Sequence, residues 1–226
     1  MKNSNEQKMK SMKNHPSAQV GFTKNYANGN PPWEIGKPQP PFVDIADQVM
    51  SPMLDCGCGT GNTSLFFAAR GLEVTGIDFV KEAILQARFK ANERNLSVEF
   101  LVKDAMTLSE WDKCFASVID SGLFHIYHGN ELQQYLKGLA HVLKPGGRLF
   151  LFSFSDKMES LGVGGMSKQE LYDTFANGWE IESLELVRGE CNPVFMAEFP
   201  EWNPNNGEPK MWFAVIRRKE QVILQN

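Results

Sequence analysis

The segment MLDCGCGTG at 53–61 constrains the fold of this 226-residue chain more than any other feature. A short apolar run ends in Asp55, three glycines follow at alternate positions, and a stretch with apolar residues at helical spacing then runs to Gly71. Strand, glycine turn and helix in this order are typical of the first unit of a doubly wound α/β sheet. Glycine suits such a turn because, without a Cβ, it lets the backbone approach a ligand closely.

The rest of the chain alternates in the same way. Short apolar runs predict buried strands at 52–56, 72–77, 97–102, 115–120 and 148–154, with helices between them, and two more strands near 179–188 and 211–217. Apolar residues at helical spacing predict a helix over 130–143 that Lys144–Gly147 (KPGG) ends. Ser167 and Glu170 form a capping box that predicts a helix over 167–176. The expected class is α/β, with a Rossmann-like sheet covered by helices on both faces.

Composition excludes several classes of protein. Lys and Arg total 23 against 27 for Asp and Glu, which gives a net charge of −4, and the chain has no long run of like charges. Both features argue against a general nucleic-acid-binding protein. No stretch is long and apolar enough for a membrane span or a secretory signal. The four cysteines lack CxxC spacing, so we expect reduced thiols, a cytoplasmic location and no metal site.

The domain organisation follows from local composition. Residues 1–30 are polar and aperiodic, and we expect a flexible tail there. Residues 31–226 are expected to form a single domain. The segment 31–41 contains five prolines, which predicts an ordered loop, and 31–50 should be a loop followed by a helix. The segment 189–210 is a long loop with several large apolar side chains, and we expect it to lie on the acceptor side of the site, since loops of this length are commonly functional.

The glycine loop does not match a dinucleotide site. The G-x-G-x-x-G pattern requires a third glycine where this chain has Asn62, and Asp55 would repel a pyrophosphate. A ligand with a cationic amine and a small anion fits better, and S-adenosylmethionine has that charge pattern. Its ammonium group can approach Asp55, while its carboxylate can lie near the start of the following helix.

Two further carboxylates end neighbouring strands. Asp78 follows Gly57 by 21 residues, where it can accept hydrogen bonds from both ribose hydroxyls. Asp104 can accept from the adenine amino group, and Ala105 offers a backbone N–H. An aspartate at a strand end can also serve only to cap the next helix. The residues expected to bind the cofactor are therefore these aspartates, the loop glycines and positions near the strand ends. They are Asp55, Cys56, Gly57, Gly59, Gly61, Asp78, Phe79, Asp104, Ala105, Asp120 and Ser121.

On these residues the chain resembles the class I S-adenosylmethionine-dependent methyltransferases, over about 31–217. The resemblance rests on DCGCGTG, VTGID, KDA and LKPGGRLFLF. It implies a seven-stranded sheet whose last strand is antiparallel. The segment PPWEIGKPQP is also similar to the N-terminal loop of thiopurine, halide and tellurite methyltransferases, which implies that Trp33 and Gly36 cover the cofactor.

The acceptor should bind beyond the fourth strand. His125 could remove a proton from an acceptor hydroxyl or amine, or could simply line the turn, and Tyr127 is a weaker candidate for catalysis. NPPW at 30–33 resembles a motif of amino-group methyltransferases, but it follows a polar segment, whereas that motif belongs at a strand end.

The sequence therefore predicts a monomeric or homodimeric enzyme that methylates a small molecule. Two alternatives remain open. One is methylation of a protein or an RNA, although nucleic acid is disfavoured, and the other is a cofactor-binding module without turnover.

Overall fold

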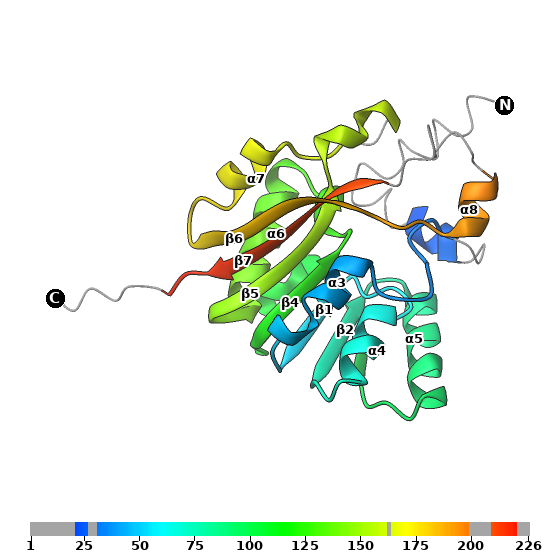
Figure 1. Cartoon of the computed structure of the whole chain (residues 1–226). Coiled ribbons are helices and arrows are strands. Elements are labelled where there is room, and N and C mark those ends of the chain that lie inside the picture. Colours follow the sequence, from blue (N-terminus) through cyan, green and yellow to red (C-terminus); the bar gives the residue numbers. More distant parts are fainter. Residues whose placement is uncertain (1–20, 27–30, 162–163, 199–208, 221–226) are drawn as a thin grey trace.

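The structure is a computed structural model that describes residues 21–26, 31–161, 164–198 and 209–220. Seven strands form one sheet in the order β3-β2-β1-β4-β5-β7-β6 (Figure 1). Strand β7 is antiparallel to both of its neighbours, and every other pair in this sheet is parallel. The predicted Rossmann-like sheet with an antiparallel last strand is therefore confirmed.

The strands lie close to the predicted positions. Their bounds are β1 Met53–Cys56, β2 Val74–Asp78, β3 Glu99–Val102, β4 Phe115–Ser121, β5 Leu143–Phe154, β6 Trp179–Arg188 and β7 Lys210–Arg218. The helices of the described residues include α3 Pro40–Asp44, α4 Asn62–Ala68, α5 Lys81–Glu93, α6 Gly129–Val142, α7 Lys168–Thr174 and α8 Pro193–Glu198. The capping box of α7 forms as expected, with Ser167 and Glu170 each bonded to the backbone of the other.

Alternate residues of the central strands face opposite layers of helices. Leu54, Val118 and Leu149 pack in one core cluster with the apolar face of α6, whereas Met53 and Ile119 pack in another with residues of α3 and α4. Figure 1 shows α4 and α5 on one side of the sheet and α6 on the other. Because both faces are covered, the carboxyl ends of the parallel strands form the open edge at which such sheets bind ligands.

Two boundaries differ from the sequence prediction. Helix α3 begins at Pro40, inside the segment expected to be a loop, because proline is compatible with the first turn of a helix. Strand β5 begins at Leu143, directly after α6, so the KPGG segment opens the strand instead of separating it from the helix. An irregular register between Phe115 and Ser117 accommodates this start.

Two helical segments lie where the sequence predicted none. Residues 21–26 are helical within the segment expected to be a flexible tail, and α8 lies within the long loop 189–210. The other parts of the expected tail and of the expected loop lie outside the described residues, at 1–20, 27–30 and 199–208.

Substitution at Gly61 tests whether the turn requires a residue without a side chain at this position. Gly61 has φ of +81°, and a Cβ there would lie 2.7 Å from the ring of Phe100 and 2.9 Å from the Cβ of Ala87. Gly61→Ala should therefore lower the free energy of unfolding by about 2 to 4 kcal/mol, through backbone strain and overpacking together.

Gly71→Ala is the matched control, because Gly71 has φ of +84° but a Cβ there would meet nothing within 4 Å. This control should cost only about 1 kcal/mol. Urea denaturation of both variants measures the difference, and equal losses would contradict the packing argument.

Candidate functional site

The glycine loop, residues 57–61, is shaped by the end of β2. The carbonyl oxygen of Ile77 accepts hydrogen bonds from the backbone N–H groups of Gly57 at 2.9 Å and Cys58 at 2.8 Å. These bonds turn the chain sharply after β1 and lead it into α4. All three glycines of this loop have positive φ: Gly57, Gly59 and Gly61.

Strand order brings the predicted acidic residues to one edge of the sheet. Because β3, β2, β1 and β4 are adjacent in that order, aspartates within two residues of their carboxyl ends occupy neighbouring positions. In that order these are Asp104, Asp78, Asp55 and Asp120. The sequence predicted this gathering, but the four side chains differ in what they contact.

Asp55 is a buried carboxylate on β1, with 1% of its surface exposed. The hydroxyl of Ser64 donates to its Oδ2 atom at 2.6 Å. Burial raises the pKa of Asp55 from 3.8 to about 7, and the negative charges of Asp78 and Asp120 add to the shift. A cation beside Asp55 would therefore relieve an electrostatic cost that the ligand-free fold carries.

Asp78 ends β2 and is bonded to the glycine loop. Its Oδ2 accepts from the N–H of Gly59 at 3.0 Å, and its Oδ1 accepts from the N–H of Val80 at 2.8 Å. Burial raises its pKa to about 6, although these two bonds act in the opposite direction. The neighbouring Phe79 is partly buried and lies edge-on to Phe22, with ring centroids 5.9 Å apart.

Asp104 follows β3 and is more accessible than Asp55 and Asp78. It caps the short 3-10 helix Ala105–Glu110, since its Oδ1 accepts from the N–H of Met106 at 2.9 Å. Ala105 is buried. Asp104 thus caps a helix, which the sequence analysis named as an alternative role. It also lies at the edge of the sheet where the adenine of the cofactor was predicted to bind.

Asp120 is held within the protein at the end of β4. Its Oδ1 accepts from the N–H groups of Leu123 at 2.8 Å and Phe124 at 3.1 Å, and the Tyr135 hydroxyl donates to its Oδ2 at 2.8 Å. The same hydroxyl contacts the Sγ of Cys56 at 3.4 Å. Asp120 and Cys56 are completely buried, so their contacts are those of the protein interior, whereas the adjacent Ser121 is partly exposed.

The two predicted catalytic residues have different surroundings. His125 is partly buried and stacks on Phe154 at the end of β5, with ring centroids 3.8 Å apart. Burial lowers its pKa to about 3, which keeps it neutral near pH 7. Tyr127 packs beside Tyr135 in the core cluster that contains Leu54 and the apolar face of α6, and burial raises its pKa above the usual range.

An aromatic cluster from the N-terminal part of the chain lies over the glycine loop. The indole N–H of Trp33 donates to the hydroxyl of Tyr26 at 3.0 Å, and Phe22 packs edge-on to Trp33 at 5.0 Å. A Cβ at Gly59 would lie 2.6 Å from the Tyr26 hydroxyl, so the two residues are in close contact. Sequence reasoning missed Phe22 and Tyr26, because the polar and aperiodic sequence around them gives no signal of these aromatic contacts.

Glu34 joins the same segment to the loop and to α5. Its carboxylate accepts from the Thr60 hydroxyl, from the Asn62 amide and, at 3.2 Å, from the N–H of Gly36. The Nζ of Lys90 lies 3.8 Å from Glu34 and bonds Thr60 and Asn62 at 2.5 and 3.0 Å. The sequence offered no signal for the contacts with Thr60, Asn62 and Lys90, since these residues are 26 to 56 positions from Glu34.

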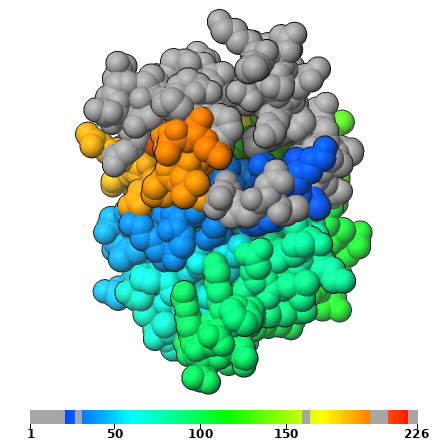
Figure 2. Space-filling model, turned by 90° about the vertical axis from the view of Figure 1, so that its right-hand side faces the viewer, coloured from blue at the N-terminus to red at the C-terminus, as the bar shows by residue number. Residues whose placement is uncertain are grey.

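The segment 31–39 is also tied to the chain that follows β6. Asn192 donates from its backbone to the Pro32 carbonyl at 2.8 Å, and Gln39 exchanges hydrogen bonds of 2.8 and 2.9 Å with the backbone of Glu190. Lys37 forms an ion pair with Glu190 at 2.9 Å. Figure 2 shows the N-terminal residues as a blue band between α8 in orange and the helices coloured cyan to green.

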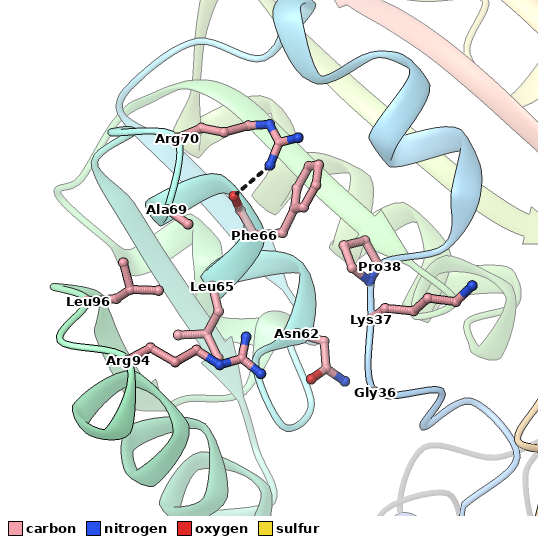
Figure 3. Close-up of a pocket in the computed structure, with 10 residues that line it drawn as sticks. All are labelled: Gly36, Lys37, Pro38, Asn62, Leu65, Phe66, Ala69, Arg70, Arg94 and Leu96. Carbon is pink, nitrogen blue, oxygen red and sulfur yellow. Dashed lines mark hydrogen bonds between the residues drawn. The ribbon is translucent and has the colours of Figure 1, made fainter.

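A separate groove lies on the outer side of α4 (Figure 3). It has a volume of about 380 Å³, and its walls come from residues 36–38, α4 and the turn after α5. Of the predicted cofactor residues it touches Gly36 and none of the aspartates. The groove is therefore distinct from the acidic edge of the sheet.

Two negative findings concern the described residues alone. Within them, no helix has the length and apolar character needed to cross a bilayer. The same part of the chain contains no group of three or more His, Cys, Asp or Glu side chains arranged to hold a metal ion.

The fold and this edge define a methyltransferase domain, and comparisons agree. Residues 53–147 match the family described as "Methyltransferase domain". The "2-heptyl-1-hydroxyquinolin-4(1H)-one methyltransferase" of Mycobacteroides abscessus is 31% identical over 168 residues, which cover 72% of this chain and 74% of that protein. The "Demethylmenaquinone methyltransferase" of Thermus thermophilus is 36% identical over 115 residues, 50% of this chain and 51% of that one.

A solved structure adds to this. The structure described as "Conversion of a Disulfide Bond into a Thioacetal Group during Echinomycin Biosynthesis" superposes with a TM-score of 0.70 at 34% identity, covering 84% of this chain and 86% of the other. The chain belongs to the S-adenosylmethionine-dependent methyltransferase family, and it is a methyltransferase enzyme.

The raised pKa of Asp55 has a consequence for stability. Because the folded value of about 7 exceeds the usual 3.8, the unfolded chain ionises first, and the ligand-free fold loses stability as the pH rises from about 4 to 7. Asp55→Asn should therefore raise the free energy of unfolding at pH 8 by on the order of 2 kcal/mol, and should change it little at pH 4.

The exposed Asp112 provides the control, since Asp112→Asn should leave stability unchanged at both pH values. Urea denaturation at pH 4 and pH 8 measures these effects. A gain for Asp55→Asn that is the same at both pH values would show that ionisation is not the cause.

Proposed function

We propose that this enzyme binds S-adenosylmethionine along the carboxyl ends of β1, β2 and β3 and methylates a small molecule bound beyond β4 and β5. The observation that supports this best is the buried carboxylate of Asp55, at the end of β1 beside a loop of three positive-φ glycines. A ligand that carries a cation and no pyrophosphate suits such a site.

Each residue of the edge has a proposed task. Asp55 faces the ammonium group, Asp78 accepts from the ribose hydroxyls, and Asp104 accepts from the adenine amino group while the N–H of Ala105 donates to the ring. Trp33 and Gly36 cover the site from the N-terminal side. When bound, the cofactor supplies a methyl group activated by a positively charged sulfur.

The acceptor is proposed to be a planar aromatic hydroxyl compound. The relative from Mycobacteroides abscessus is named for a hydroxylated quinolinone. In this chain, His125 lies in the short 3-10 helix Phe124–Ile126 that follows β4, and its ring stacks on Phe154 at the end of the adjacent strand β5. The chain's contribution would be to hold two reactants in line and exclude water.

Calorimetric titration with S-adenosylmethionine or S-adenosylhomocysteine tests the cofactor, and absence of binding would refute the proposed function. An acceptor screen with a labelled methyl donor tests the class of acceptor. Transfer to a protein or an RNA but to no small molecule would favour the alternative substrate class.

Asp78→Ala should weaken binding of S-adenosylhomocysteine by about 1.5 to 3 kcal/mol, because two charge-assisted hydrogen bonds would be lost. Titration calorimetry measures the change, and thermal unfolding of the same variant checks that the glycine loop still folds. Unchanged affinity would remove Asp78 from the site.

The pH dependence of binding tests the role of Asp55. Because its pKa in the ligand-free protein is about 7, the carboxyl becomes protonated below that pH and no longer attracts an ammonium group. Affinity for S-adenosylmethionine should fall roughly fivefold to tenfold between pH 8 and pH 6. Methylthioadenosine lacks the amino group and should show a clearly smaller change. Equal changes for the two ligands would contradict the proposed contact.

A further inference from the structure

The hydrogen bonding of His125 fixes which of its ring nitrogens holds the proton. The backbone N–H of Phe154 donates to the Nδ1 of His125 at 3.4 Å. A neutral imidazole has one N–H and one acceptor nitrogen, so a ring that accepts at Nδ1 carries its proton at Nε2. Among the described residues, no hydrogen bond engages Nε2. His125 therefore offers a free N–H donor.

The same geometry opposes the role of general base. Since Nε2 already holds a proton, a second proton could add only at Nδ1, where it would meet the N–H of Phe154. The stacked ring of Phe154 also shields the imidazole from water. The titratable neighbour whose charge acts on His125 is His128, and it too lowers the pKa. Burial and this neighbour together keep the ring neutral.

We propose that His125 donates a hydrogen bond from Nε2–H to an acceptor oxygen that is already ionised, and that the acceptors are acidic hydroxyls such as phenols and N-hydroxy heteroarenes. This inference rests on the proposed function and specifies its substrate class. It replaces the role of base that the sequence suggested for His125.

The chemistry balances without a base in the protein. The hydroxyl proton passes to water before the acceptor binds. A lone pair of the oxygen anion then forms the new O–C bond as the C–S bond of the sulfonium breaks, and its electron pair stays on sulfur as a neutral thioether. His125 keeps the same proton throughout, and its N–H orients the anion.

Two substitutions separate a donor from a base. His125→Gln retains an N–H donor but cannot accept a proton at neutral pH, whereas His125→Phe retains a flat ring for stacking and has no donor. We expect His125→Gln to keep kcat/KM within about threefold of the parent enzyme, and His125→Phe to lower it about 10- to 100-fold, as for loss of a hydrogen bond to a charged group. Equal loss in both variants would overturn the proposal.

A pH profile with two acceptors of different acidity gives an independent readout. With 4-nitrophenol and 4-methoxyphenol at saturating S-adenosylmethionine, kcat/KM for the acceptor should rise with pH and level off at the pKa of each acceptor, so the two breaks should differ. A break at one common pH would indicate an ionising group of the enzyme and would overturn the proposal. Methyl transfer to amines or alkyl alcohols but to neither phenol would also overturn the proposal.

Nitrogen-15 NMR tests the tautomer without turnover. In the parent protein, the signal that disappears in His125→Gln should show a protonated Nε2 and an unprotonated Nδ1, unchanged from pH 8 to pH 5. A proton on Nδ1, or titration in this range, would refute the donor assignment. Failure to bind S-adenosylmethionine would instead refute the proposed function, which keeps the two failures distinguishable.

Discussion

The end of β2 is the part of the structure on which the site depends. The carbonyl of its penultimate residue, Ile77, accepts hydrogen bonds from two N–H groups of the glycine loop, and the side chain of its last residue, Asp78, accepts a third from Gly59. These bonds set the path of the chain from β1 into α4. Asp78 lies near the buried carboxylate of Asp55, whose pKa is raised mainly by burial and further by the negative charge of Asp78. Buried negative charge destabilises the fold, and a cationic ligand bound beside it would offset that cost.

Most of the fold could be predicted from the sequence, because the strong signals are local. Runs of apolar residues located all seven strands, and the apolar face of α6 and the capping box of α7 identified two helices. The boundaries that differed involve residues with two compatible conformations. Pro40 can begin a helix as well as belong to a loop, and the glycines after Pro145 allow β5 to start immediately after α6.

The candidate site was predictable only in part. The aspartates at strand ends could be placed at one edge, since parallel strands share their carboxyl end. Their individual partners depend on tertiary contacts that no spacing reveals: Asp120 accepts from Tyr135, and Tyr26 covers Gly59. The hydrogen bond that fixes the His125 tautomer likewise comes from β5, 29 positions away.

The bonds between residues 31–39 and the segment after β6 bear on how this enzyme could be re-engineered. Gln39 and Glu190 are 151 positions apart, yet each satisfies the other's polar groups. Grafting a new sequence after β6 without its N-terminal counterpart would leave amide and carbonyl groups unmatched. Chimeras aimed at a different methyl acceptor should therefore exchange the two segments as one module.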